Sequence, residues 1–282
     1  SGASRVRPRH LFARGGRRAS MSPPASTPAP DSDRASSDDS DSASAAAPAL
    51  VADSQRFLRA VRTPDDRGPA LDTVRTRIAN ASPAELDALG PDERLAFWLN
   101  VYNAATGAAL LADPDRFENR RRFFGESIVT VAGTDLSLDQ IEHGILRGSQ
   151  WKYGLGYVPN PFPSAFVRRH RVADPDARVH FALNCGAASC PAVAAYDAAD
   201  VDAQLDRAAG SYLRSETVVE DGTARIPRLL LWYRGDFGGR SGIHTLLREY
   251  DAIDPDSISR IRYREYDWSL ALDAFRTEEE PR

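Results

Sequence analysis

Hydrophobic positions in the central part of the chain recur mostly at the spacing of amphipathic helices. Such spacing predicts helices at 51–61, 71–78, 199–213 and 241–250. The segment from Asp92 to Ala112 contains RLAFWLNVYNAATGAALL, which is apolar on almost every side. A helix that is apolar all round is buried, so this segment predicts a central core helix.

Local signals place the ends of several helices. Ser82 followed by Pro83 predicts a helix cap and a proline at the first helical position. Pro91 predicts the start of the central helix in the same way. Ser137 and Gln140 have the spacing of a capping box, which predicts a helix running to about Arg147.

Shorter apolar segments predict a small amount of sheet. Strands are expected at 127–131, 178–184 and 260–268, with a further strand pair around Asp221-Gly222. The type of 227–233 is ambiguous, and 148–175, rich in Gly, Pro and aromatic residues, is expected to be an ordered loop. The fold class is therefore α+β, with a buried central helix packed on a small sheet.

Three parts of the chain differ in composition. Residues 1–50 combine an Arg-rich head with a linker of Ser, Pro, Ala and Asp, and they predict a disordered N-terminal tail. We interpret the head as sequence upstream of a translation start at Met21; a basic arm for an anionic partner is the alternative. One folded domain is expected at 51–275, followed by an acidic tail at 276–282.

The charge balance narrows the classes of partner. The chain has 36 Lys and Arg residues against 40 Asp and Glu residues, a net charge of −4, and Lys152 is its only lysine. This acidic, Lys-poor composition indicates a salt-adapted or high-GC source. It disfavours nucleic-acid binding, which needs a positive face. No segment suggests a membrane span or a secretory signal, so we expect a cytoplasmic protein.

The first candidate for chemistry is a pair of amides in the central helix. Asn100 and Asn103 are three residues apart and share one helix face. A buried amide must have its donors and acceptors matched. The amides could tie neighbouring loops to the helix, which is the commoner role, or one could orient a catalytic group or bind an oxyanion.

The second candidate is IEHGILR at 141–147, which carries Glu142, His143 and Arg147. His143 and Arg147 lie on one helix face. They could form a helix-terminal ion pair with a packed histidine. Because imidazole titrates near neutrality, His143 could instead be a general base or a ligand.

The third candidate is HFALNCGAASCP at 180–191, which holds both cysteines of the chain. Cys185 or Cys190 could be an activated thiolate beside an imidazole. The pair could also form a reversible disulfide, or bind zinc with His143 or His180. Alternatively, both cysteines are small buried hydrophobic residues.

Together these stretches resemble the family named domain of unknown function 547. The matching segments are FWLNVYNA at 97–104, LSLDQIEHGILR at 136–147, RVHFALNCGAASCP at 178–191, LLWYRGDFG at 230–238 and YDWSL at 266–270. The resemblance implies that the family's signature positions are Asn100, Tyr102, Asn103, Glu142, His143, Arg147, His180, Cys185, Gly186, Ser189 and Cys190. It also suggests a distant relation to papain-like or transglutaminase-like thiol folds.

The leading functional hypothesis is a thiol-dependent hydrolase or acyl transferase without a cofactor or metal. Cys185 would be the nucleophile, with His143 or else His180 as base, Asn100 or Asn103 orienting that base, and loop amides near Gly186 binding the oxyanion. The substrate, an unknown small molecule or peptide, would contact Tyr102, Glu142, Arg147, Gly186, Ser189 and Cys190.

Two alternatives remain open. One is a non-catalytic module that binds a protein partner, and the other is a redox or structural metal-binding cysteine loop. Trp151, Tyr153 and Tyr157 could form a substrate wall or a packed lid, of which the lid is the more ordinary expectation.

Overall fold

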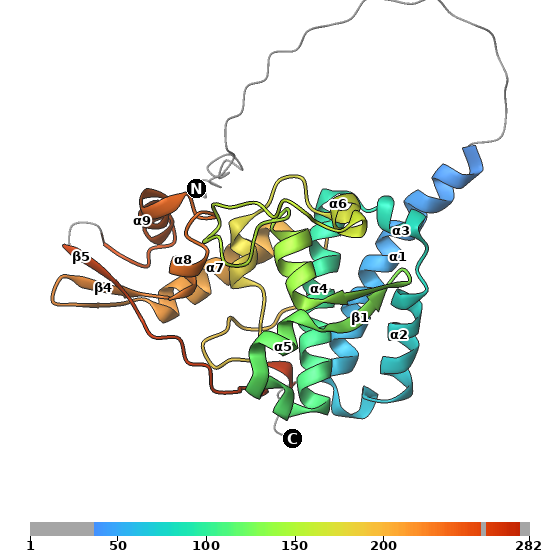
Figure 1. Cartoon of the computed structure of the whole chain (residues 1–282), viewed down its shortest axis with the longest axis horizontal. Helices are drawn as coiled ribbons and strands as arrows, with labels where there is room; N and C mark the ends of the chain where they lie inside the picture. The colour runs from blue at the N-terminus through green and yellow to red at the C-terminus, as the bar shows by residue number, and fades with distance from the viewer. Residues whose placement is uncertain (1–36, 255–257, 277–282) are drawn as a thin grey trace, which may run out of the picture.

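The computed structural model describes residues 37–254 and 258–276 and has an α+β fold (Figure 1). The proposed disordered tail falls mainly on residues 1–36, and the acidic tail on 277–282, outside the described residues. The boundary expected at residue 50 lies inside helix α1, Ser37–Arg62, in which Leu50 is fully buried. The Ala-rich run before Pro48 has high helix propensity, which explains the earlier start.

Four helices form the first half of the fold, on one side of Figure 1. They are α1, α2 (Pro69–Ala79), α3 (Pro83–Asp87) and α4 (Pro91–Ala112). These helices confirm the predictions at 51–61, 71–78 and 92–112. Helix α4 is the buried central helix, because it packs along α1 and against strand β1, and 97–107 are all buried.

Helix α4 is also long and apolar enough, by length and composition, to cross a membrane. This differs from the expectation that no segment comes close to a span. Most of α4 is buried inside the protein, as in the core helix of a folded domain.

The predicted cap at Ser82 and the predicted capping box at Ser137 are both present, and the Ser82 cap is itself a capping box. Ser82 and Glu85 exchange hydrogen bonds at the start of α3, and Ser137 and Gln140 do so before the helix Gln140–Leu146. The second helix, η3, is a π-helix, in which the N–H of Arg147 donates to the carbonyl of Glu142. Such wider turns occur mostly as single insertions and often at functional sites.

The described strands form two small sheets. Strands β1 (Ser127–Val131) and β2 (Thr134–Ser137) pair antiparallel. The second sheet has the order β3-β4-β5, formed by Val218–Glu220, Thr223–Ile226 and Arg260–Tyr263. The turn at Asp221-Gly222 has positive φ at both residues, as a tight hairpin requires, and confirms the predicted strand pair.

The prediction of a strand at 178–184 was wrong. Residues Ala177–Phe181 form the 3₁₀ turn η4, because the Asp176 side chain accepts the N–H of Arg178 and starts a helical turn. The ambiguous segment 227–233 contains the short helix α8, Leu229–Trp232. The loop at 148–175 contains α6, Ala165–His170.

The other described elements are all helical. They are η1 (Pro64–Asp66), η2 (Pro114–Asn119), α5 (Arg120–Gly125), α7 (Val201–Glu216), α9 (Gly239–Glu249) and η5 (Asp273–Phe275). Helices α7 and α9 confirm the helices expected at 199–213 and 241–250. After β5 the chain returns across the molecule, and Phe275 packs in the core beside α1 and α4 (Figure 1).

This return segment fits closely at Gly107 of α4. A Cβ added there would lie 2.5 Å from Cδ1 of Phe275 and 2.9 Å from Cγ1 of Val61. We therefore expect G107A to lower the free energy of unfolding by about 1–3 kcal/mol through overpacking, measured by urea denaturation. G125A is the matched control, because a Cβ at Gly125 meets open space. Equal stabilities for the two variants would contradict the packing described here.

Candidate functional site

The two amides of α4 bind backbone groups in distant segments. Asn100 donates to the carbonyl of Tyr196 at 2.8 Å and accepts its N–H at 2.8 Å. Asn103 donates to the carbonyl of Ala182 at 2.9 Å and accepts the N–H of Asn184 at 2.9 Å. Both amides therefore serve mainly the backbone, with one further bond from Asn100 Nδ2 to the Ser54 hydroxyl at 3.2 Å, and the described hydrogen bonds of neither amide reach a histidine. The expected role of orienting a base is not the one that they have.

Asn184 extends this connection from α4 to the cysteines. Its Oδ1 accepts the N–H of Gly186 at 2.8 Å, and its Nδ2 donates to the carbonyl of Pro191 at 2.7 Å. The side chain is buried and spans the two ends of residues 185–190, which we call the thiol loop. The amide of Asn184 thus closes the thiol loop.

The thiol loop brings its two cysteines together. The N–H of Cys185 donates to Sγ of Cys190 at 3.0 Å. The hydroxyl of Tyr266 lies 3.6 Å from Sγ of Cys185 and 3.2 Å from Sγ of Cys190. Both cysteines are free thiols and are half-buried residues packed against the core.

These contacts divide the charge unequally between the two sulfurs. Burial raises the pKa of Cys190, but the Cys185 thiol, the Tyr266 hydroxyl and backbone N–H groups outweigh it, and the net pKa is lowered. The pKa of Cys185 is raised well above its usual value by its hydrogen bond to Cys190, by burial and by the charge of that neighbour. The first thiolate of the pair is therefore on Cys190.

Most N–H groups of the thiol loop already have acceptors. The N–H of Gly186 donates to Oδ1 of Asn184. The N–H of Ala188 donates to the carbonyl of Ser269 at 2.9 Å, and the N–H of Cys190 donates to the carbonyl of Ala187 at 3.0 Å. Ser189 donates to the carbonyl of Asp267, and its own carbonyl accepts the hydroxyl of Tyr212. The expectation that amides near Gly186 bind an oxyanion needs correction for these four N–H groups, which hold the loop in place, but not for the N–H of Cys185, which points at Sγ of Cys190.

A second group of polar side chains, the ionic cluster, consists of Glu142, His143, Arg147, His180, Tyr233 and Asp236. Arg147 is almost fully buried and binds Asp236 twice, through Nε to Oδ2 at 2.6 Å and through Nη2 to Oδ1 at 3.2 Å. Its Nη1 lies 2.9 Å from Nδ1 of His143, and its guanidinium lies over the ring of Tyr233. A buried guanidinium needs such compensation.

The partners of each imidazole assign its tautomer. Arg147 can only donate, so Nδ1 of His143 accepts and the proton lies on Nε2. Nε2 of His180 lies 2.8 Å from Oδ2 of Asp236 and donates to it, which leaves the lone pair on Nδ1. The ring of His180 stacks on Tyr233 at 3.7 Å, and burial lowers the pKa of His180 despite the nearby carboxylate.

Asp236 is held as a carboxylate. Burial alone would raise its pKa. Hydrogen bonds and charge from His180 and Arg147 outweigh burial, so the net pKa lies below its usual value. The contact between Asp236 and His180 is the shortest pairing of a histidine with a carboxylate among the described residues. It forms a carboxylate–imidazole dyad with a lone-pair nitrogen.

Two tyrosines bind Glu142 of the ionic cluster. The hydroxyls of Tyr233 and Tyr102 donate to the carboxylate of Glu142 at 2.7 and 3.2 Å. The pKa of Tyr102 is raised well above its usual value by burial, then by the charges of Glu142 and Cys185. No hydrogen bond joins either sulfur to an imidazole in the part of the chain that the structure describes. The cluster and the loop are neighbours, because the ring of Trp232, next to Tyr233, lies 4.9 Å from the ring of Tyr266, whose hydroxyl contacts both sulfurs.

Three residues of this region, Tyr233, Asp236 and Tyr266, were not selected from the sequence. They lie in LLWYRGDFG and YDWSL, which carry the resemblance but contain neither cysteine nor histidine. Asp236 is 89 residues from Arg147 along the chain, so no spacing rule connects the two. The one signal for Asp236 in the sequence is that it is a carboxylate within LLWYRGDFG, a segment that matches the family.

The loop after η3 approaches Asp236 closely and presents aromatic side chains outward. A Cβ on Gly156 would lie 2.6 Å from the backbone nitrogen of Asp236, so only glycine fits there. Exposed aromatic and apolar residues follow along this loop, with Trp151 at 50%, Tyr153 at 63% and Phe162 at 89%. These side chains do not form a packed lid.

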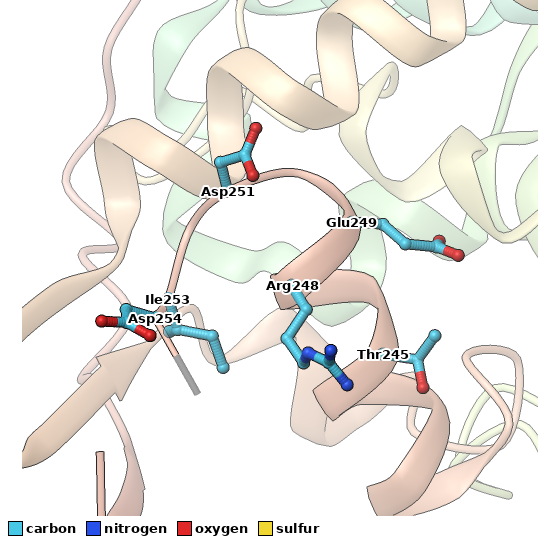
Figure 2. Close-up of a pocket in the computed structure, with 6 residues that line it drawn as sticks. All are labelled: Thr245, Arg248, Glu249, Asp251, Ile253 and Asp254. Carbon is cyan, nitrogen blue, oxygen red and sulfur yellow. The ribbon is translucent and has the colours of Figure 1, made fainter. Parts of the chain in front are cut away.

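Two surface pockets lie elsewhere. One, of about 630 Å³, is lined by α9 and the segment after it, with Arg248 among Glu249, Asp251 and Asp254 (Figure 2). The other, of about 820 Å³, lies between α1 and α2. Neither is lined by a cysteine or a histidine. Within residues 37–254 and 258–276, no three His, Cys, Asp or Glu side chains are grouped as metal ligands, so nothing there supports the zinc alternative.

The lowered pKa of His180 makes stability depend on pH. Below about pH 6.5 the unfolded chain binds a proton on this imidazole that the folded protein does not. The free energy of unfolding therefore decreases as the pH is lowered. We expect wild type to lose about 1 kcal/mol more than H180Q between about pH 8 and pH 5.5, measured by urea denaturation. Equal losses would show that burial does not hold His180 neutral.

Comparison with known proteins gives one result, which covers the loop and part of the cluster. Residues 86–213 match the family described as "Protein of unknown function, DUF547". No curated protein and no solved structure matches the chain. The matched range includes α4, η3, His180 and the thiol loop, whereas Asp236 and Tyr266 lie beyond it. Through residues 86–213, somewhat less than half of its length, the chain is similar to the DUF547 family.

Proposed function

We propose that the chain is a thiol-dependent hydrolase or acyl transferase whose nucleophile is the thiolate of Cys190. The observation that carries this proposal is the bond from the N–H of Cys185 to Sγ of Cys190 at 3.0 Å, with the Tyr266 hydroxyl 3.2 Å from the same sulfur. Donors on a sulfur favour its thiolate, which is the reactive form. Cys185 was the nucleophile expected from the sequence; the contacts favour its neighbour.

The same N–H has a second use in acyl transfer. When the thiolate attacks a carbonyl carbon, an S–C bond forms and negative charge moves from sulfur to the carbonyl oxygen. The N–H of Cys185 already points at the sulfur, and it can follow the charge to the oxyanion. Collapse breaks the bond to the leaving group, which takes a proton from water, and a thioester on Cys190 remains.

The dyad of His180 and Asp236 supports the proton transfers. Nδ1 of His180 has a lone pair and the ring is held neutral by burial, which are the properties of a general base. Arg147 fixes Asp236 with two hydrogen bonds and so fixes the ring orientation. In this proposal His180 activates the water, or the acceptor, that cleaves the thioester.

The aromatic loop suggests the kind of substrate. Trp151, Tyr153 and Phe162 are exposed on a loop whose Gly156 lies against Asp236. We infer an acyl donor, small molecule or peptide, with an apolar flank that contacts these rings. We also propose a reducing, cytoplasmic setting, in which both thiols remain free.

We propose the relation to papain-like folds only for the arrangement of helix, thiol and imidazole. In those folds the thiol begins the central helix. Here the thiol loop is tied to the central helix α4 by the side chain of Asn103. A shared arrangement of helix, thiol and imidazole would therefore be convergent in its details.

Trapping an acyl group tests the proposal. We expect p-nitrophenyl acetate to acetylate wild type and C185S on Cys190, seen by peptide mass spectrometry, and C190S to form no such adduct. H180Q should acetylate but release acetate at least about tenfold more slowly, because deacylation loses its base.

Acetylation of C190S at the wild-type rate would contradict the assignment of Cys190 as the nucleophile. Acetylation of wild type on surface groups only would contradict it as well. Circular dichroism of each variant serves as the folding control. The conservative exchange of sulfur for oxygen keeps the size of the side chain, so loss of the adduct reports on the thiol.

A second function is favoured by one observation, the exposed aromatic loop. Its backbone is ordered by Trp151 N–H to Val158 at 2.9 Å and Asn160 N–H to Ser149 at 2.8 Å. Rigid exposed aromatic residues are typical of protein-binding surfaces. A non-catalytic interaction module would retain a protein partner in C190S and lose it when Trp151 and Phe162 are replaced.

A further inference from the structure

We propose that the thiol loop is a redox modification site, at which Cys185 and Cys190 form a reversible disulfide when a hydroperoxide is the oxidant. This inference rests on the geometry of the loop and deepens the proposed function, because the same sulfur is the proposed nucleophile. Formation of the disulfide can be measured without any substrate.

The two sulfurs are already gathered at one point. Both lie within hydrogen-bonding range of the single hydroxyl of Tyr266, at 3.6 and 3.2 Å. The N–H of Cys185 reaches Sγ of Cys190 at 3.0 Å, so the backbone that carries one thiol touches the other. A disulfide requires the two sulfurs to meet, and these contacts already hold both of them around one hydroxyl.

The backbone of the loop is curled so that its ends meet. Asn184 bonds both Gly186 and Pro191, which holds the start of the loop against its end. Gly186 has φ +93°, and a Cβ there would lie 2.4 Å from Leu110, so the curl requires glycine. A crosslink would close a short loop that the fold already shapes, so the native state loses little on bridging.

Access and composition favour pairing within the chain. Both cysteines are half-buried, which admits a small oxidant and hinders the approach of another protein. They are the only two cysteines of the 282 residues, so each is the other's sole partner in the chain. Oxidation should therefore give one defined product.

The oxidation can be written with atoms and electrons balanced. The Cys190 thiolate attacks one peroxide oxygen, the O–O bond breaks, and a sulfenic acid forms while hydroxide leaves and takes up a proton. The Cys185 sulfur then attacks the sulfenic sulfur and gives up its proton, which leaves with the displaced hydroxide as water. In total two thiols and one hydrogen peroxide give one disulfide and two waters, and a dithiol reductant reverses the change.

The experiment uses the reduced full chain and hydrogen peroxide as the probe. We expect intact-mass spectrometry to show the loss of two hydrogen atoms and thiol titration to fall from two groups to none, with both reversed by dithiothreitol. C185S should gain oxygen on Cys190 instead. C190S should react at least about tenfold more slowly than C185S, because it lacks the stabilised thiolate.

Three results would overturn the inference. They are gain of oxygen by wild type without loss of hydrogen, a disulfide-linked dimer as the main product, and equal rates for C185S and C190S. The inference and the proposed function can fail separately. Disulfide formation without acetylation of Cys190 would remove the enzyme and keep the redox site, and acetylation without a disulfide would do the reverse.

Discussion

The shape of the candidate site depends on buried amides that replace missing backbone partners. Asn103 is fully buried in α4 and binds the carbonyl and N–H groups of a segment that has no strand beside it. Asn184 repeats this at the ends of the thiol loop. An unmatched buried amide or carbonyl costs about 1–3 kcal/mol, so these bonds specify one loop conformation. The position of both sulfurs follows from that conformation.

The ionic cluster imposes a second constraint. The buried charge of Arg147 would be costly without the carboxylate of Asp236, and that pairing joins η3 to the segment after α8. The π-helical turn of η3 ends at Arg147 and places its guanidinium beside His143. The cluster therefore holds distant segments together whether or not it takes part in chemistry. Its special feature is that His180 donates through Nε2 to Asp236 and so has its lone pair on Nδ1.

The sequence predicted most of the helices, because their signals are local. The apolar residues on every side of α4 and the helix cap at Ser82 could be recognised without knowledge of distant residues. Residues 178–184 were misread as a strand, because burial of a short apolar segment does not distinguish a strand from a 3₁₀ turn. The N–H contact from Arg178 to Asp176 decided that case.

The site was predicted in part for the same reason. Cys185, Cys190 and both histidines stand out by residue type, and the structure gathers them in one region. The partners that define their chemistry do not stand out: Tyr266 is 76 residues from Cys190, and Asp236 is 56 from His180. The roles of Asn100 and Asn103 depend on which backbone groups meet them in three dimensions.

The assignment of the thiolate to Cys190 is the central claim, and alkylation tests it most directly. The rate of iodoacetamide labelling of each cysteine can be followed against pH by peptide mass spectrometry. The account predicts that Cys190 reacts faster, with an inflection below the ordinary thiol value of 9.0, and that Cys185 stays unreactive to higher pH. Faster labelling of Cys185, or an ordinary inflection for Cys190, would contradict it.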